Sequence, residues 1–387
     1  MDTLKYIVKL LLGLIAGSAI GLLIGGAAAL LFTDADWHQL LHKFAQIDII
    51  ELCTLVVTAF LSAIAAGILA IILHEGGHLI FGLLTGYRFV SFRVFSLTLL
   101  RNDGHFRWKR FSLGGTGGQC LMRPPARPVE QIDTRWYNAG GVLVNLLTAC
   151  ISIGLYLYST APAEGSRLPT WLEMFCLISF IINIFIALFN GIPLRLGGIG
   201  NDGYNLFHLE TRPTDKLLLY RMLEANALIQ SGTQPKDLPA EWFPHPSTTD
   251  WADGLQANWQ MMAVAHFENR HDWDAAHELL ADAMDHRTKL LGLFQNELTA
   301  EMFFVCLATG RTDEARHYWT DDIATYVRKY AKTQSSKQRI LFAKALLLDA
   351  DPASAHTLLD ALKERKEQYL LQGEVAMDLE LMQWLLA

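Results

Sequence analysis

Residues 52–81 read LCTLVVTAFLSAIAAGILAIILHEGGHLIF, an apolar run that ends in two histidines and a glutamate. A helix that crosses a bilayer needs about 20 apolar residues, and residues 52–73 contain no charge at all. His74 and His78 follow at a spacing of four, which places both on one face of a helix, about one turn apart. The stretch therefore predicts a membrane helix with a polar cluster at one end.

This polar cluster has the spacing of a metal site. Two histidines at i and i+4 can share a metal ion, while Glu75 between them is free to act on a water molecule. Ionisable side chains in an apolar membrane helix are costly unless they face a cavity and find partners there. We interpret His74, Glu75 and His78 as a metalloprotease zinc site, with a structural or proton-relay cluster as the alternative.

The composition divides the chain into two halves. Residues 1–210 hold 27 of the 71 charged residues, about 13%, whereas residues 211–387 hold 44, about 25%, the share usual in soluble proteins. The second half also carries the excess of acidic residues, so we expect no nucleic acid partner. Five singly placed cysteines suggest neither a disulfide framework nor a thiolate zinc site.

Three further segments are equally long, apolar and uncharged: residues 10–32, 139–159 and 174–194. A signal peptide is the alternative for the first, because Lys5 and Lys9 precede it, but its apolar run is too long for one. Nine basic residues lie between the second and third spans, against one each in loops 33–51 and 160–173. Since short basic loops stay in the cytoplasm, we predict a multi-pass protein of the cell membrane with both termini cytoplasmic.

A zinc site needs a third protein ligand, and hydrolysis needs a further position for water. The fourth span is followed by Asn190-Gly191-Ile192-Pro193, then by a glycine-rich stretch and Asn201-Asp202-Gly203. Pro193 ends the helix and the glycines let the chain fold back, so Asp202 can approach the histidines from the same membrane face. Asp202 is therefore the predicted third ligand.

Together these motifs resemble the site-2 protease family of intramembrane zinc metalloproteases. The resemblance rests on the His-Glu-x-x-His motif in a membrane helix and on the later Asn-x-x-Pro and Asp-Gly elements. Residues 139–145, AGGVLVN, are similar to the family's Gly-Pro-x-x-Asn element, with Val142 where proline is common. Residues 114–122, GGTGGQCLM, resemble the Gly-Gly strand of its membrane-associated hairpin. The similar part covers about residues 50–210.

The resemblance implies a fold and a reaction. The expected fold is an all-α membrane protein with four transmembrane helices and a small membrane-associated β-hairpin region, and the expected membrane is that of a bacterial cell. The expected reaction is cleavage of a membrane protein or membrane-associated peptide, as in regulated intramembrane proteolysis.

The resemblance also implies roles for individual residues. His74, His78 and Asp202 would bind one zinc ion, with Glu75 as general base and acid. Asn145 and Asn190 would hydrogen-bond the substrate backbone or the oxyanion. Gly117 and Gly118 would bind the substrate at the Gly-Gly strand. From Pro193 to Asp202 the chain runs nine positions, about four more than is common in the family.

Residues 211–387 are predicted to form helical hairpins, because three polar turns align between apolar helices. In these turns Ala276, Ala315 and Ala355 recur 39 and 40 residues apart. The pattern resembles degenerate tetratricopeptide-like (TPR-like) repeats, with an irregular all-helical domain as the alternative. Such a domain would bind a protein or peptide partner in the cytoplasm.

The chain is thus predicted to have three parts. Residues 1–50 form an N-terminal transmembrane helix and external loop, residues 51–210 the intramembrane metalloprotease core, and residues 211–387 the helical repeat domain. The alternative function is a non-catalytic, membrane-anchored scaffold whose helical repeats bind a protein or peptide.

Overall fold

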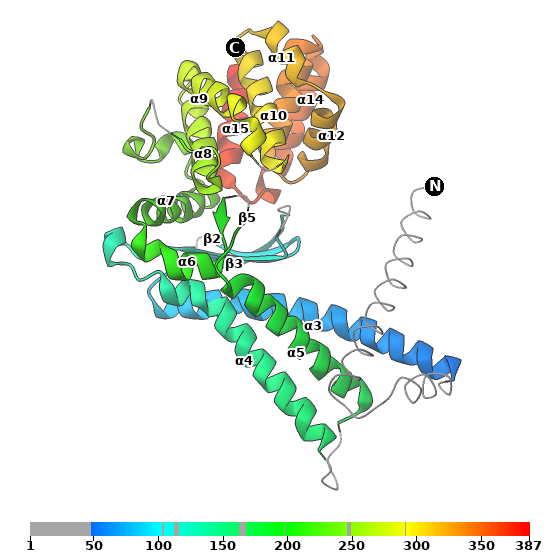
Figure 1. Ribbon diagram of the computed structural model, residues 1–387. Coiled ribbons are helices and arrows are strands. Elements are labelled where there is room, and N and C mark those ends of the chain that lie inside the picture. The colour runs from blue at the N-terminus through cyan, green and yellow to red at the C-terminus, as the bar shows by residue number, and fades with distance from the viewer. Residues whose placement is uncertain are drawn as a thin grey trace. The chain divides into compact units, whose positions relative to one another are not determined.

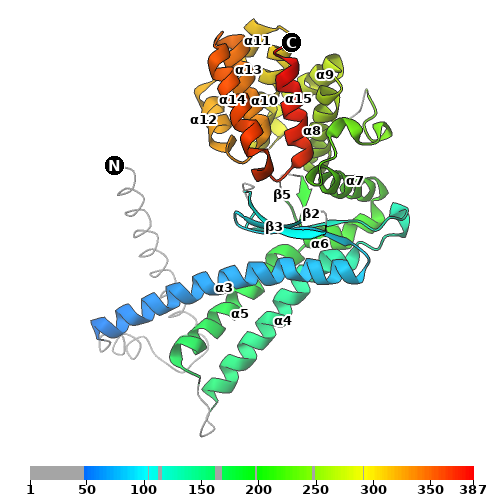
Figure 2. The ribbon, with the colours of Figure 1, turned by 180° about the vertical axis from the view of Figure 1, so that it is seen from behind.

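The computed structural model describes residues 48–102, 104–111, 116–161, 168–196, 198–245, 249–290 and 292–387. The first predicted span, at residues 10–32, lies outside the described residues. The described chain is mostly helical, with two small antiparallel sheets (Figures 1 and 2). It divides into two compact units, one of residues 48–68 and 149–182, the other of residues 69–148 and 183–387.

Three helices are long and apolar enough to cross a membrane: α3 (Ile49–Leu84), α4 (Arg135–Thr160) and α5 (Thr170–Gly191). They correspond to the second, third and fourth predicted spans. α3 continues beyond residue 73 because the apolar sequence resumes after the histidines, and it ends just before Gly86, whose φ is 92°. α5 ends at Gly191 and not at residue 194, because Pro193 cannot continue a helix and disfavours helical geometry in the residue before it.

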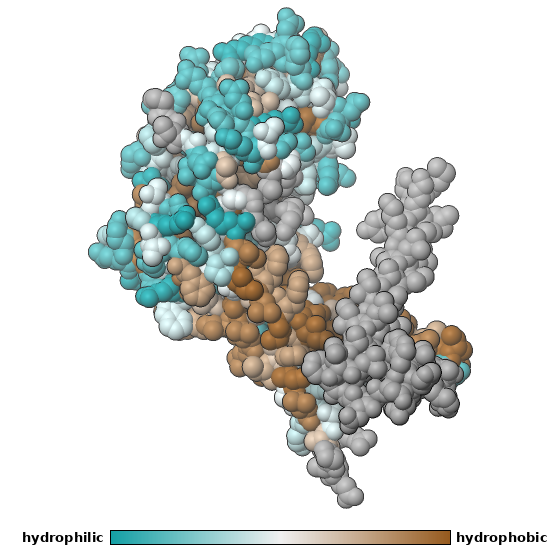
Figure 3. All heavy atoms as spheres, in the orientation of Figure 1, coloured by the Kyte–Doolittle hydropathy of each residue, from teal (hydrophilic) through white to brown (hydrophobic). Residues whose placement is uncertain are grey.

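The surfaces of these helices are unusually apolar for a protein in water. On the face shown in Figure 3, hydrophobic residues predominate over the visible parts of α3, α4 and α5, whereas hydrophilic residues predominate over the helices from α8 onward. Side chains such as Leu61, Leu147 and Phe185 are 58%, 60% and 67% exposed. Exposed apolar surface of this extent marks contact with another apolar medium, which indicates a membrane protein.

The larger sheet has four antiparallel strands in the order β3-β2-β1-β4. Their bounds are Arg88–Val94 for β1, Leu97–Asn102 for β2, His105–Arg110 for β3 and Gly118–Arg123 for β4. The sequence predicted only a small hairpin region. The structure extends it, because β2 pairs with both β1 and β3 and so adds two further antiparallel strand pairs. β4 pairs with β1 alone among the described strands, so its other edge is unpaired.

A short hairpin separates α5 from the next helix. It consists of β5 (Arg195–Leu196) and β6 (Ile199–Gly200), and α6 (Asp202–His208) follows it directly. The backbone N–H of Asn201 donates to the carbonyl of Leu194 at 3.0 Å, so the chain returns to the point where it left. The long spacing between Pro193 and Asp202 is therefore taken up by this hairpin.

The remaining helices are α7 (Pro213–Gln230), α8 (Gly254–Asn269), α9 (Trp273–Asp285), α10 (Gly292–Ala308), α11 (Thr312–Tyr318), α12 (Asp321–Tyr330), α13 (Ser335–Ala343), α14 (Pro352–Arg365) and α15 (Gln372–Trp384). They pack around two hydrophobic clusters, a large one that all of them but α14 contribute to and a smaller one that contains the buried side chains of α14. α7 lies against the sheet, where the Ser91 hydroxyl donates to the side-chain oxygen of Gln230 at 3.1 Å and Arg123 pairs with Glu224.

The three turns aligned in the sequence share one backbone geometry. His271, Gly310 and Ala350 have φ values of 58°, 74° and 52°, the left-handed region that lets a chain reverse sharply. Five residues after each of them comes an alanine that is fully buried: Ala276, Ala315 and Ala355. Each turn joins two helices in contact, α8 with α9, α10 with α11, and the π-helical end of α13 with α14.

Candidate metal centre

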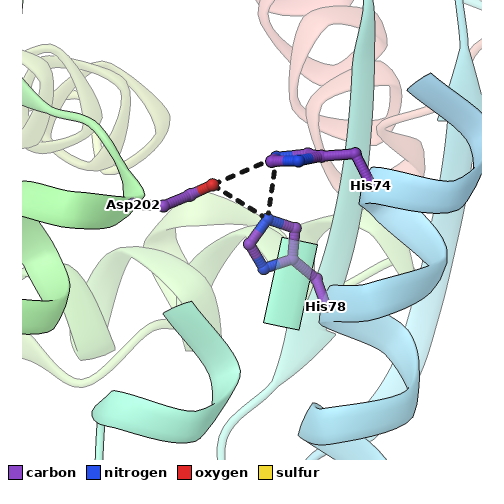
Figure 4. Close-up of side chains that lie close together, drawn as sticks. All are labelled: His74, His78 and Asp202. Carbon is purple, nitrogen blue, oxygen red and sulfur yellow. Dashed lines mark hydrogen bonds and ion pairs between the residues drawn. The ribbon is translucent and has the colours of Figure 1, made fainter. Parts of the chain in front are cut away.

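Three side chains from distant parts of the sequence converge on one point (Figure 4). His74 and His78 lie on α3 and are 8% and 7% exposed, and Asp202 is the first residue of α6. The two Nε2 atoms are 3.3 Å apart, and Asp202 Oδ2 lies 3.0 Å from that of His74 and 3.2 Å from that of His78. The three predicted ligand residues are therefore brought together.

Each imidazole is held by an oxygen on its far side. His74 Nδ1 lies 2.6 Å from Asn145 Oδ1, and His78 Nδ1 lies 2.8 Å from the Tyr137 carbonyl oxygen. The Tyr137 carbonyl oxygen can only accept a hydrogen bond. The same holds for Asn145 Oδ1, because the amide nitrogen of Asn145 donates elsewhere, to the Ala70 carbonyl at 3.2 Å and to Asn183 Oδ1 at 2.7 Å. The ring protons therefore lie on Nδ1, and the Nε2 lone pairs point toward the shared centre.

The shape of this centre fits a tetrahedral metal ion. Bonds of about 2.0–2.1 Å at the tetrahedral angle separate neighbouring donor atoms by about 3.3–3.4 Å, close to the separations given above. Asp202 Oδ2 is buried, and its close polar neighbours among the described residues are the two histidine Nε2 atoms. Two imidazole lone pairs and a carboxylate oxygen repel one another at this distance unless a cation lies between them. His74, His78 and Asp202 could thus hold a metal ion.

Glycines bring the helices close enough to form the centre. A Cβ at Gly77 would lie 2.2 Å from the Gly140 carbonyl oxygen, so only glycine allows α3 and α4 to approach this closely. A Cβ at Gly141 would lie 2.6 Å from Cε1 of His74. The AGG sequence that begins at residue 139 therefore makes room both for the helix and for the ligand.

Asn201 fixes the position of Asp202. Its Oδ1 accepts from the backbone N–H of Tyr204 at 2.9 Å, which caps α6, and from that of Leu194 at 3.1 Å. Its Nδ2 donates to the carbonyls of Phe189 and Ile192, both at 2.8 Å. One side chain thus joins the end of α5, the hairpin and the start of α6, which sets where Asp202 meets the histidines.

Glu75 lies beside the start of β4. Its carboxylate accepts a backbone hydrogen bond from Cys120, and a Cβ on Gly118 would lie 2.6 Å from Glu75 Oε1. Arg93, 2% exposed, donates to the Gly118 carbonyl at 3.2 Å and so holds this part of the strand. A Cβ on Gly117 would be 3.2 Å from Ile71 Cδ1, so Gly117 also packs against α3.

The predicted substrate-binding residues have different surroundings. All three polar contacts of the fully buried Asn145 side chain are with protein groups, and in this structure it positions His74. Asn190 donates from Nδ2 to the carbonyl of Ile186 at 3.0 Å, within its own helix. Substrate binding by Asn145, Asn190, Gly117 and Gly118 stays a prediction.

Three residues that support the centre were not singled out from the sequence: Asn183, Asn201 and Arg93. Asn183 carried a signal, because it is an amide in the middle of an apolar span. Asn201 stands directly before Asp202, a position in which asparagine commonly caps a helix. Arg93 gave no signal, because basic residues are common throughout the loop between the second and third spans.

A second group of possible ligands, His277, Cys306 and Glu314, lies among the later helices. Burial raises the pKa of Cys306 to about 12, which disfavours the thiolate that binds metals, and we assign no ion to it. The first centre offers three ligands, a neighbouring carboxylate and an adjacent strand edge.

Comparison with protein-family models, curated proteins and solved structures finds no match to this chain.

Proposed function

We propose that this protein is an intramembrane zinc endopeptidase of the site-2 protease type, which cleaves a membrane-embedded or membrane-associated protein. The observation that carries the proposal is the convergence of two Nε2 atoms and Asp202 Oδ2 beside Glu75, at one end of an apolar helix of membrane length. Buried ionisable groups in such a helix are expensive, which favours a functional reason for them.

The donor set favours zinc. Two imidazoles and a carboxylate are typical of catalytic zinc sites, which keep a further position open for water or substrate. His74, His78 and Asp202 would hold the ion, and the oxygens that bind each Nδ1 would fix the two rings. Zinc in this place would supply Lewis acidity that activates water and polarises a peptide carbonyl.

Glu75 would carry the proton. Its carboxylate is adjacent to the histidine pair in sequence and is held by the Cys120 backbone, so it could take a proton from the attacking water. The same carboxyl group would then give that proton to the leaving amine, which separates as the peptide bond breaks.

A substrate helix must unwind before it can be cut, because its carbonyls are engaged in its own hydrogen bonds. The unpaired edge of β4, with Gly118 against Glu75, could take up the unwound segment by strand addition. New ladder bonds would then replace the lost helix bonds, and the scissile carbonyl would lie next to the proton carrier.

The proposed topology has four spans and two cytoplasmic termini in a multi-pass cell-membrane protein. Three apolar helices of sufficient length and the basic residues between the second and third spans support it. Residues 211–387 would be a cytoplasmic TPR-like domain, supported by the repeated geometry of the turns at His271, Gly310 and Ala350.

The test is cleavage by the purified protein of a single-span substrate in lipid vesicles. Wild type should cut it, while Glu75→Gln should bind zinc stoichiometrically and not cut, and His74→Ala should lose the zinc. Glu51→Gln, at the exposed start of the same helix, is the matched control and should behave as wild type. Equal cleavage by wild type and Glu75→Gln would overturn the proposal. A folded, zinc-free wild type would favour the scaffold.

A further inference from the structure

A cavity of about 300 Å³ lies among the helices that follow the sheet. Side chains of α7, α8, α10, α12, α13 and α15 line it, together with Phe111, which follows directly after β3. Its volume is at the lower end of the range of about 300–1,000 Å³ for small-molecule pockets. It has room for one or two side chains and not for a folded partner.

One wall of this cavity is strongly acidic. Its charged lining consists of four carboxylates and one guanidinium: Glu268, Glu297, Glu301, Glu374 and Arg339. Arg339 donates to Glu268 Oε2 and to Glu301 Oε2, both at 2.7 Å. Glu297 is bound by the buried Lys337 at 2.6 Å, and a fifth carboxylate, Asp378, lies 2.9 Å from Arg339 Nε. Five carboxylates therefore share two cations.

The acidic wall is short of positive charge at two specific places. Glu374 forms no hydrogen bond or ion pair with any described residue. Glu268 is 1% exposed, and its Oε1 has no hydrogen-bond partner among the described residues although its Oε2 is bound by Arg339. Burial, and then the charge of Asp378, raises the pKa of Glu374 to about 8. Each of the two groups could accept a hydrogen bond from a cation seated in the cavity that both line.

Much of the remaining lining is apolar. This apolar part is formed mainly by flexible or aromatic side chains: Met222, Met261, Met262, Phe294, Leu371 and Met377. A cavity lined by both carboxylates and methionines suits a side chain with an aliphatic stem and a cationic head. Lysine and arginine have this structure, and a small inorganic cation does not.

The cavity adjoins the sheet that carries the candidate substrate edge. Phe111 lines the cavity and also packs with Leu100 of β2 and with Leu370. Lys109 of β3 donates to the carbonyl of Tyr369 at 2.7 Å, which ties β3 to the segment just before α15. A chain seated in the cavity would therefore lie close to the sheet that places Gly118 beside Glu75.

We propose that this cavity binds a lysine or arginine side chain from the cytoplasmic flank of the membrane-spanning substrate. The inference rests on the proposed protease function, which supplies the reason for a membrane substrate. Cytoplasmic flanks of membrane helices are rich in lysine and arginine, so the substrate carries the charge that the cavity lacks. The cavity would hold the flank while the neighbouring segment reaches the strand edge.

The experiment uses the full-length protein and two kinds of probe. The first is a capped, fluorescent peptide of alternating leucine and lysine, with a matched peptide in which glutamine replaces lysine. We expect the lysine peptide to bind more tightly, and Glu374→Gln to weaken it by about tenfold or more, as for the loss of one hydrogen bond to a charged group. Glu374→Lys should abolish binding, and Glu364→Gln on the exposed face of α14 should not change it.

The second probe is a single-span substrate with lysine or glutamine in its cytoplasmic flank. For wild type the glutamine flank should raise KM by about tenfold with kcat unchanged, and for Glu374→Gln the two flanks should have the same KM. If wild type has the same KM for the lysine and glutamine flanks, or binds the two peptides equally, and cleavage still depends on Glu75, the inference is overturned and the proposed function stands. Failure of the proposed function would appear differently, as the absence of any difference between wild type and Glu75→Gln.

Discussion

Replacing Gly141 by alanine should displace a metal ligand without touching the metal-binding atoms. The new Cβ would lie 2.6 Å from Cε1 of His74 and 2.7 Å from both ring nitrogens. Carbon atoms in ordinary contact are at least about 3.5 Å apart, so the ring must move by about 0.8–0.9 Å. Ligand distances in metal sites tolerate only about 0.2 Å, and the bond from Asn145 restrains the ring on its other side.

The expected result is a fall in zinc affinity of at least about 100-fold, which corresponds to about 2.7 kcal/mol of binding free energy. A loss of this size equals the upper end of the range observed when a metal ligand loses its hydrogen-bond partner. The assay is competition with a chromogenic chelator on detergent-purified protein. Gly154→Ala, on the same helix, is the matched control, because no heavy atom lies within 4 Å of the Cβ it would add. Gly154→Ala should leave the zinc affinity unchanged. Because alanine favours helical geometry over glycine, it should also stabilise the helix by up to about 1 kcal/mol.

A folded Gly141→Ala variant with wild-type zinc affinity would refute this reasoning. It would mean that zinc is not bound through His74 in the position described, or that no zinc is bound. Circular dichroism and thermal unfolding of both glycine variants establish whether the helices are intact. Loss of zinc from both variants alike would point to general damage to α4 and would equally contradict the expectation.

Three further predictions concern other parts of the structure. Asn145→Leu removes the acceptor on His74 Nδ1 and should weaken zinc binding by about 10–100-fold in the same chelator assay, whereas Ser152→Ala, which breaks a buried 3.0 Å contact with Ser179, should not. Gly118→Ala would place a Cβ 2.6 Å from Glu75 Oε1, so this variant should retain zinc but lose most of its cleavage activity. Gly117→Ala would place a Cβ 3.2 Å from Cδ1 of the flexible Ile71 side chain and should keep most of its cleavage activity. Equal cleavage rates for the two variants would contradict this expectation. Because the pKa of Glu374 is raised to about 8 from 4.5, the folded chain holds a proton that the unfolded chain releases, so stability falls as the pH rises between these values. Glu374→Gln should therefore raise Tm relative to wild type at pH 9 and not at pH 4, and parallel Tm curves would show that the carboxyl group is not buried as described.

The helical architecture could be predicted from the sequence because its signals are local. Apolar runs without charge are found by composition, and three of the four predicted spans coincide with helices α3, α4 and α5. The turns at His271, Gly310 and Ala350 were aligned through their polar residues and a following alanine, and each reverses the chain in the same way. The extent of the sheet was underestimated, because the basic side chains of β1, β2 and β3 make these short strands resemble a polar loop.

The sequence by itself determined that two histidines and a glutamate share one turn of an apolar helix, since helical periodicity fixes that relation within five residues. Only the tertiary structure decided what meets them. Asp202 reaches His74 and His78 because the hairpin at residues 195–200 absorbs the extra chain, and Asn145 holds a ligand because glycines let two helices touch. Such contacts join residues up to about 130 positions apart, and their geometry depends on packing between elements, which spacing along the chain does not encode.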